Sequence, residues 1–493
     1  MNKIRRIARI TTLSLLLLFV QCSTFRFVSQ REARYQTVRR QIEFLLSDPT
    51  LANAHIGIYI ESLKDGRVVF QNNPFKLMVP ASNLKLFTTS AALINLGPEF
   101  RFRTEIYASA APGDSTLNGD LIVKGSGDPS ISGRFYHGDG LFVFKSWADS
   151  LRHLGIKEIT GDLIGDNRYF KEPSFGEGWS WDDESYWYSA HTSALSFNDN
   201  CLDFTIWADS VGAPVKISVF PFADSLRIIN KAVAVDSGGD STLTLTRLNG
   251  QDVYIIAGTL PVSADTVHES VTVEHPARYF LGTLYRVLRK EGIKIKGQIK
   301  VIAQDDSLDY NKAVPLFVHK SHPVSDLIRV VNKVSHNFYA DQLLKTMGAR
   351  FEGEGSFTAG CKFVKDWLQS IGVAPSYFFN VDGSGLSRKN FVAPIATATL
   401  LKTMYHHPYF HYFYDSLPIA GVDGTIAHRM LGTPAQGNVH AKTGYVQRMR
   451  ALSGYVNIGK DDPMIFVMMF NNYSLPTPVV NKIQDHICEL ISQ

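Results

Sequence analysis

The sequence predicts an α+β fold in which an antiparallel sheet carries helices on both faces and is interrupted by large β-rich insertions. Two pairs of β-rich runs lie near opposite ends of the chain, and a helix that carries Ser82 follows the first pair. Short strands and turns fill most of the interval from 99 to 311. The 493 residues are too many for one compact core, and a content of 45% hydrophobic and 19% charged residues is typical of folded globular proteins.

The first 22 residues have the pattern of an export signal. Basic residues precede an apolar run from Leu13 to Val20, which is too short to span a bilayer well. The basic residues are Lys3, Arg5, Arg6 and Arg9. They account for the formal net charge of +4, because residues 1–21 contain no acid. The mature chain is therefore near neutral, and we expect an exported, periplasmic or cell-envelope protein without a nucleic-acid partner.

The cysteines do not indicate a disulfide scaffold, although an exported chain could pair some of them. They are widely spaced, at Cys22, Cys201, Cys361 and Cys488. Cys22 ends the apolar run, as a lipid-bearing cysteine would, but Phe19 and Gln21 differ from the aliphatic and small residues that such a processing site prefers. Lipidation of Cys22, which would bring membrane association, and signal cleavage just after Cys22 both stay open.

Both ends of the chain contribute to the predicted main sheet. Alternating apolar runs and turn residues such as Lys64-Asp65-Gly66 indicate two hairpins, and the flanking segments have helical periodicity. Strands are expected at 55–61, 67–71, 450–458 and 464–470, and helices at 30–46 and 476–491. One antiparallel sheet with the terminal helices on one face accounts for this order.

A helix is expected to begin near Ala81 or Ser82, directly after Pro80, because proline favours a helix start and apolar residues recur at helical spacing over 84–94. This places Ser82 in the first turn and Lys85 three residues later on the same face. A serine must lose its proton to attack a carbonyl, and a lysine whose charge is disfavoured by burial can accept that proton. For an S-x-x-K motif alone, a serine cap followed by an unrelated lysine is the competing interpretation.

Two further motifs favour the catalytic interpretation. Ser335 and Asn337 form an S-x-N motif, and Lys442-Thr443-Gly444 form a K-T-G motif on a predicted edge strand. The order S-x-x-K, S-x-N, K-T-G is the signature of penicillin-binding proteins and serine β-lactamases. Each string is weak alone, but the three in this order are hard to obtain by chance.

The chain resembles the D-alanyl-D-alanine carboxypeptidases of the low-molecular-mass class C penicillin-binding proteins, the S13 peptidases. The resemblance covers most of the mature chain, and further matching segments are 125–129, 193–200, 382–388 and 421–425. Two residues depart from the family pattern: His336 stands where Asp or Asn is usual, and Tyr445 follows K-T-G where Thr or Ser is common. Neither departure removes a catalytic group, but both could alter substrate fit.

The resemblance implies a transpeptidase-like domain of the penicillin-binding-protein and β-lactamase type, with two inserted domains, one nested in the other. The predicted parts are the signal at 1–22, the first catalytic part at 30–98, the insertion at 99–311 and the second catalytic part at 312–493. Helices at 337–349 and 358–371 would line the other side of the cleft. Within the insertion we expect strands at 103–108, 117–123, 202–207, 242–248, 252–258 and 271–273, and helices at 140–154 and 277–291.

The predicted chemistry is acyl transfer through a covalent serine ester. Ser82 attacks the carbonyl of a terminal D-Ala-D-Ala bond, and Lys85 accepts its proton, although the general base is disputed in this superfamily. Ser335 could relay the proton to the leaving amine, and Asn337 would hold the substrate amide and Lys85. Lys442 would supply positive charge for the terminal carboxylate of the substrate and help to lower the pKa of Lys85.

The remaining predicted site residues bind substrate. Thr443 adds a hydroxyl donor, Gly444 lets the strand approach the ligand, and the backbone N–H groups of Ser82 and Tyr445 form the oxyanion hole. The resemblance places Arg388 beside the cleft as a candidate partner for a side-chain carboxylate, with a structural ion pair as the alternative. Asp166 is a further candidate for the same subsite. No metal or organic cofactor is needed.

The predicted function is therefore a serine D,D-carboxypeptidase that acts on peptidoglycan stem peptides and binds penicillin covalently, with D,D-endopeptidase activity left open. A β-lactamase shares the acylation machinery, but the large insertion and the lack of a Glu-x-x-Leu-Asn string favour the cell-wall enzyme. An inactive wall-binding scaffold is the third alternative, and the complete set of motif residues argues against it.

Overall fold

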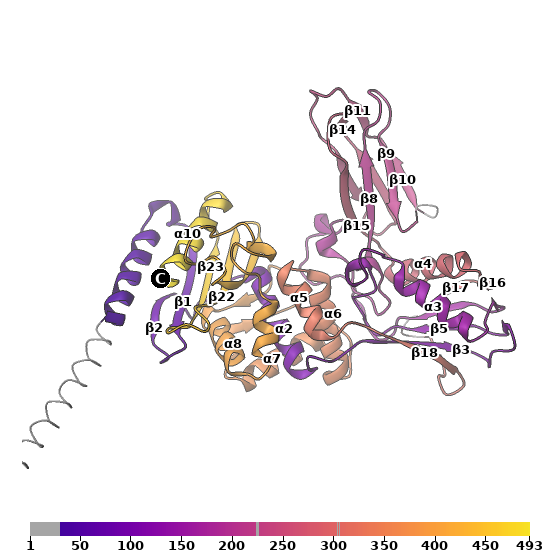
Figure 1. Cartoon of the computed structure of the whole chain (residues 1–493), viewed down its shortest axis with the longest axis horizontal. Coiled ribbons are helices and arrows are strands. Elements are labelled where there is room, and N and C mark those ends of the chain that lie inside the picture. Colours follow the sequence, from indigo (N-terminus) through magenta and orange to yellow (C-terminus); the bar gives the residue numbers. More distant parts are fainter. Residues whose placement is uncertain (1–29, 223–225, 303, 305) are drawn as a thin grey trace, which may run out of the picture.

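The computed structural model describes residues 30–493 except 223–225, 303 and 305. The predicted export signal and Cys22 lie outside these residues. Within the described ranges, no helix combines the length and the apolar character needed to cross a bilayer. Figure 1 shows a main unit that contains the C-terminus, a second sheet beside it, and a narrow unit that projects away from both.

The main sheet has the strand order β2-β1-β23-β22-β21, and every neighbouring pair is antiparallel. The strands are β1 (His55–Ser62), β2 (Val68–Asn72), β21 (His440–Val446), β22 (Met449–Val456) and β23 (Met464–Asn471). β23 is buried at every position, because both faces of the sheet are covered. The prediction that both chain ends build one antiparallel sheet is confirmed.

Helices cover the two faces of the main sheet (Figure 1). Helix 30–46 and α10 (Thr477–Ile491) share one apolar cluster with the sheet, through side chains such as Tyr35, Phe470 and Ile487. The other face belongs to a second cluster that contains most of the remaining helices. These are α2 (Leu84–Asn95), α5 (Val324–Lys333), α6 (Asn337–Met347), α7 (Phe357–Ser370), α8 (Pro394–His406) and α9 (Phe410–Ser416).

The insertion begins with a second sheet of order β17-β7-β5-β3-β18. Its strands are β3 (Arg103–Ala108), β5 (Leu121–Lys124), β7 (Leu163–Asp166), β17 (Ile299–Ile302) and β18 (Val314–Lys320). Helices α3 (Phe142–His153) and α4 (Pro276–Lys290) pack their apolar faces on this sheet. The predicted strand at 117–123 is instead two strands, β4 (Thr116–Leu117) and β5, because the chain bends at Asn118 and Gly119 between them.

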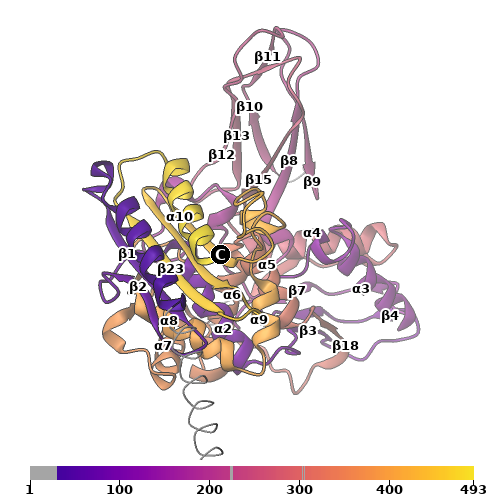
Figure 2. The same cartoon turned by 60° about the vertical axis from the view of Figure 1, so that its left-hand side comes forward.

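Residues 201–273 form the projecting part, here called the distal unit (Figures 1 and 2). Its two larger sheets have the orders β15-β8-β9 and β10-β13-β12, and they share one small apolar core. The strands are β8 (Cys201–Trp207), β9 (Lys216–Phe220), β10 (Arg227–Asn230), β12 (Thr244–Arg247), β13 (Val253–Ala257) and β15 (Val267–Thr272). The domain division stays a prediction, but β18 pairs with β3 although it lies beyond the predicted boundary at 311.

Asp462, in the turn between β22 and β23, ties the N-terminal helix to the main sheet. Its carboxylate accepts hydrogen bonds from Arg31 at 2.5 Å, from the Tyr35 hydroxyl at 2.8 Å and from Ser62 at 2.8 Å. Burial raises the pKa of Asp462, but the hydrogen bonds from Arg31, Tyr35 and Ser62 outweigh it and hold this pKa below its usual range. The ionised carboxylate is therefore the form that stabilises the fold.

We expect Asp462→Asn to lower the free energy of unfolding by about 1.5–3 kcal/mol at neutral pH, the usual value for hydrogen bonds to a charged group. Because the folded pKa lies below the unfolded value of about 3.9, this stabilisation is present above pH 4 or so and disappears as the pH falls through the folded pKa. Thermal unfolding of both proteins across this pH range measures the difference. The exposed neighbour Asp461→Asn is the control, and a loss that does not change with pH would contradict the assignment.

Candidate active site

Ser82 lies in a short 3-10 turn, Ala81–Asn83, that leads directly into α2. The helix start after Pro80 is as predicted, but the turn that carries the serine is tighter than an α-helix. The loop at 382–388 packs against this turn so closely that a Cβ on Gly385 would lie 1.9 Å from the carbonyl oxygen of Ala81. Gly385 also has a φ of +81°, so glycine is required there on both grounds.

The Lys85 amine is fully buried beside the Ser82 hydroxyl. Its Nζ donates to Ser82 Oγ at 2.8 Å, to Asn337 Oδ1 at 2.5 Å and to the carbonyl oxygen of Ser384 at 2.6 Å. Burial lowers the pKa of Lys85 to about 7, against the opposing influence of Asp341 and Asp382. Near pH 7 a large fraction of Lys85 is therefore neutral and can accept the proton of Ser82.

Asp341 lies one helical turn after Asn337 on α6 and was not predicted as part of the site. Burial and the nearby Asp382 raise the pKa of Asp341 to about 8, so its neutral form is favoured near pH 7. The Asp382 carboxylate accepts hydrogen bonds from the backbone N–H groups of Gly385 and Ser387, both at 2.8 Å. These bonds fix the conformation of the loop that contains all three residues. The i, i+4 spacing from Asn337 was the available sequence signal for Asp341.

Ser335 lies between α5 and α6 with a φ of 60°. It accepts a hydrogen bond of 2.8 Å from Lys442 Nζ, which also donates to the carbonyl oxygen of Thr443 at 2.9 Å. Burial and the neighbouring Lys85 lower the pKa of Lys442 well below its usual value. Two buried amines thus each contact one serine hydroxyl of the site.

The K-T-G motif lies on β21, the edge strand of the main sheet, as predicted. A Cβ on Gly444 would lie 2.6 Å from the carbonyl oxygen of Pro80. The glycine thus permits packing against the turn that carries Ser82, a reason different from the predicted approach of a ligand. Thr443 Oγ1 donates to Thr425 Oγ1 at 2.8 Å, and the Tyr445 side chain is exposed.

A cleft of about 710 Å³ opens over these groups. Ser82, Ser335, Asn337, Tyr445 and Arg388 line it, as the sequence predicted. The other lining residues lie outside the predicted site residues and come from the loop at 178–188, from 385–386, from 446–447 and from Val334: Gly178, Ser180, Asp182, Asp183, Trp187, Tyr188, Val334, Gly385, Leu386, Val446 and Gln447. The Lys442 and Thr443 side chains are buried and are not part of this lining, but Lys442 donates to Ser335, which is.

The structure does not place Asp166, the further predicted candidate for the substrate subsite, at the cleft. It ends β7 of the second sheet, is absent from the lining of the cleft, and its carboxylate is held by Arg168 at 2.8 Å and Tyr310 at 2.7 Å. The acids that do line the cleft are Asp182 and Asp183. Their position between two aromatic runs was the signal available in the sequence.

His336, one of the two departures from the family pattern, points its imidazole toward the insertion. Its Nε2 lies 3.0 Å from Asp199 Oδ2, and Arg134 pairs with the same carboxylate at 2.7 Å. Burial raises the pKa of Asp199, but the charges of His336 and Arg134 outweigh this and lower it to about 2. His336 therefore joins α6 to the insertion.

A protein-family model described as the D-Ala-D-Ala carboxypeptidase 3 (S13) family matches residues 38–493. The chain belongs to this family. The predicted resemblance is confirmed over nearly all of the described chain. A D-alanyl-D-alanine carboxypeptidase of Actinomadura sp. is 31% identical over 500 residues, which cover 99% of this chain and 90% of the relative. The carboxypeptidase DacB of Haemophilus influenzae is 28% identical and covers 85% of this chain and 86% of the relative.

Solved structures agree with this membership. Penicillin-binding protein 4 of Haemophilus influenzae superposes with a TM-score of 0.79 and 27% identity, over 91% of this chain and 99% of that one. Its complex with a β-lactam superposes with a TM-score of 0.74 and 26% identity, over 92% of this chain and 99% of that one. The predicted fold class, a penicillin-binding-protein fold with additional domains, is confirmed.

The lowered pKa of Lys85 gives a pH prediction. Acylation by benzylpenicillin should require neutral Lys85, so its rate should fall as the pH drops below about 7, and Lys85→Met should abolish it. Stopped-flow measurements between about pH 5 and 9 would determine the profile. Lys345→Met is the control, because Lys345 is also buried, with a pKa that burial lowers to about 8, but it contacts Thr192 and the backbone of the insertion. A flat profile would rule out Lys85 as the base.

Proposed function

We propose that this S13 family member is a serine D-alanyl-D-alanine carboxypeptidase that cleaves peptidoglycan stem peptides through an acyl-enzyme. The observation that carries the proposal is the 2.8 Å contact between the buried amine of Lys85 and Ser82 Oγ at the cleft. A serine hydroxyl with a base of pKa about 7 at hydrogen-bond distance is an activated nucleophile. The similarity to the D-alanyl-D-alanine carboxypeptidases of Actinomadura sp. and Haemophilus influenzae supports the same activity.

In the proposed reaction, Ser82 Oγ attacks the carbonyl carbon of the D-Ala-D-Ala peptide bond while neutral Lys85 takes its proton. The tetrahedral intermediate collapses to an ester of Ser82, and the peptide C–N bond breaks. The leaving D-alanine amine receives a proton from Ser335, which takes one in turn from Lys442 at 2.8 Å. Water then attacks the ester and its proton passes through Ser335 back to Lys442, while Lys85 returns the proton it holds to Ser82 Oγ and regenerates the hydroxyl.

The K-T-G strand is proposed to bind the terminal carboxylate of the substrate. Burial and the neighbouring Lys85 lower the pKa of Lys442 in the free enzyme, and an arriving carboxylate would favour its charged form, which then attracts that carboxylate. Lys442 Nζ also donates to Ser335, which lines the cleft. The Thr443 hydroxyl would turn from Thr425 to the carboxylate when substrate is bound. The backbone N–H groups of Ser82 and Tyr445 are proposed as the oxyanion hole.

β-Lactam antibiotics are proposed to acylate Ser82 in the same way. A β-lactam complex of the similar penicillin-binding protein 4 supports this expectation. The rate of ester hydrolysis separates a penicillin-binding protein from a β-lactamase, since both use the same acylation step. Peptidoglycan lies outside the cytoplasm, so this substrate fits the proposed export of the protein. Lipidation of Cys22 and cleavage after Cys22 are the two alternatives for the mature N-terminus.

Arg388 and Asp183 support a proposal for the third residue of the stem peptide. Both line the cleft, and among the residues that the structure describes the Arg388 guanidinium has a single hydrogen-bond contact, a long one of 3.5 Å to Gln447. The Asp183 carboxylate accepts from the Tyr188 hydroxyl at 2.8 Å, which leaves its second oxygen for a ligand. A side chain that ends in both an amine and a carboxylate, as in meso-diaminopimelate, matches this pair of charges.

The nucleophile assignment predicts that Ser82→Ala forms no covalent adduct with benzylpenicillin and releases no D-alanine, with little change in thermal unfolding. Intact-protein mass spectrometry followed over time measures the adduct. Ser180→Ala is the matched control, since Ser180 also lines the cleft, and it should keep the adduct. A persistent wild-type adduct supports the carboxypeptidase, rapid loss of the adduct indicates a β-lactamase, and no wild-type adduct indicates an inactive scaffold.

The specificity assignment predicts that wild type prefers a pentapeptide with meso-diaminopimelate over the same peptide with L-lysine. Arg388→Ala should lower kcat/KM for the first peptide roughly ten- to a hundredfold, because a charge-assisted hydrogen bond contributes about 1.5–3 kcal/mol, and leave the second nearly unchanged. Lys389→Ala is the control, because that side chain pairs with the exposed Glu177. Equal losses for both peptides would make Arg388 a structural residue.

A further inference from the structure

The distal unit is joined to the wall of the cleft through three consecutive residues, Glu184, Ser185 and Tyr186. The carbonyl oxygen of Glu184 accepts from Thr272 Oγ1 at 2.5 Å, and Ser185 Oγ exchanges hydrogen bonds of 3.0 Å with the backbone N–H and C=O of Arg247. Tyr186 forms an isolated bridge with Val271. This short segment therefore continues the edge of the distal unit.

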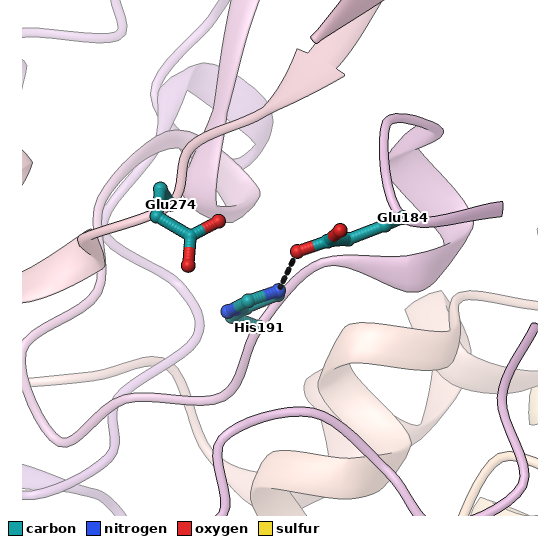
Figure 3. A group of neighbouring side chains, drawn as sticks. All are labelled: Glu184, His191 and Glu274. Carbon is teal, nitrogen blue, oxygen red and sulfur yellow. Dashed lines mark ion pairs between the residues drawn. The ribbon is translucent and has the colours of Figure 1, made fainter. Parts of the chain in front are cut away.

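The Arg247 side chain strengthens this junction from within. It is fully buried and lies between two carboxylates, with Glu184 at 3.0 Å and Glu274 in direct contact. The Nε2 atom of His191 lies 3.4 Å from the Glu184 carboxylate, and Figure 3 shows the side chains of Glu184, His191 and Glu274 pointing toward one another. A guanidinium suits this place because it can bind two carboxylates through separate N–H groups.

Glu184, His191 and Glu274 have the side-chain types of a metal site, and their ligand atoms lie within 4.8 Å of one another. The Arg247 guanidinium, however, already supplies the positive charge that these carboxylates need. It also contacts the carbonyl oxygen of Gln251 at 3.3 Å, so it is held in the cluster from several sides. Burial lowers the pKa of His191, which favours its neutral form and leaves Arg247 as the cation.

The residues on either side of this anchored segment belong to the cleft. Asp183 precedes it, and Trp187 and Tyr188 follow it. The carbonyl oxygen of Tyr188 accepts from Asn337 Nδ2 at 2.8 Å, and Asn337 Oδ1 accepts from Lys85 at 2.5 Å. Movement of the anchored segment would therefore displace one acid of the proposed subsite and a hydrogen bond of the catalytic asparagine.

We propose that Arg247 is a positioning residue for substrate recognition, which fixes the cleft wall at 183–188 by binding Glu184 and Glu274. The distal unit, which carries Arg247 on β12, thereby contributes to the selection of the stem peptide without touching it. The kinetic part of this proposal rests on the proposed function. Its structural part, that Arg247 holds the segment still, is tested independently of activity.

Kinetic measurements compare Arg247→Met with wild type on the diaminopimelate and lysine pentapeptides, per active site titrated with benzylpenicillin. We expect the preference for the diaminopimelate peptide to fall roughly tenfold, mainly through KM, because displaced binding groups lose that much or more. Arg247→Lys should recover part of the preference. Arg429→Met, which breaks the similarly buried pair with Asp485 near α10, should lower stability but keep the preference.

Hydrogen exchange followed by mass spectrometry supplies the activity-independent test. Exchange over 183–188 should be faster in Arg247→Met than in wild type, even if wild type were not acylated by penicillin and the proposed function failed. Where Arg247→Met does not fold, Glu184→Gln tests the same bridge. Unchanged exchange and unchanged preference would overturn the proposal. So would a wild-type activity that a chelator abolishes and Zn²⁺ alone restores, because a metal ion, and not Arg247, would then hold the carboxylates.

Discussion

The contact between Ser82 and the buried amine of Lys85 is the interaction on which the site depends. An amine in water holds its proton to about pH 10 and cannot act as a base at neutral pH. Removing it from water lowers its pKa, and this requires apolar surroundings on all sides. Residues 84–93 of α2 are accordingly all buried between the main sheet and the helices of its second face. The layers of the main unit thus provide the burial that lowers the pKa of Lys85.

The same burial must satisfy the polar groups that it hides. All hydrogen-bond donors of the Lys85 ammonium have partners: Ser82, three residues earlier, and two groups from distant segments, Asn337 and Ser384. The carboxyl of Asp341, which would otherwise hold Lys85 charged, has a raised pKa because it is buried and because Asp382 lies beside it. Two acids and two lysines therefore share one buried region, and their mutual influence sets which of them is charged near pH 7.

Helix α6 contacts both the main unit and the insertion and joins them through hydrogen bonds. Its first residue, Asn337, contacts both Lys85 and Tyr188, and one turn later Gln342 donates to the carbonyl oxygens of Gly127 at 3.1 Å and Ser193 at 2.9 Å. Lys345 continues this face by donating to the carbonyl oxygen of Lys171 at 2.7 Å. Polar side chains on one face of a helix thus fix the insertion against the cleft, which makes the insertion part of the site.

The sequence by itself determined the two-ended main sheet and the three short motifs from which the proposed nucleophile and base come, because each depends on a local pattern: helical spacing after Pro80, alternation in strands, and short motifs of fixed order. Only the tertiary structure decided that Asp166 pairs with Arg168, that Asp182 and Asp183 line the cleft, and that Gly444 is required by Pro80. It also decided that burial lowers the pKa of Lys85, against the opposing charges of Asp341 and Asp382. These outcomes depend on contacts between residues far apart in the chain, and such contacts leave no periodicity in the sequence from which they could be predicted.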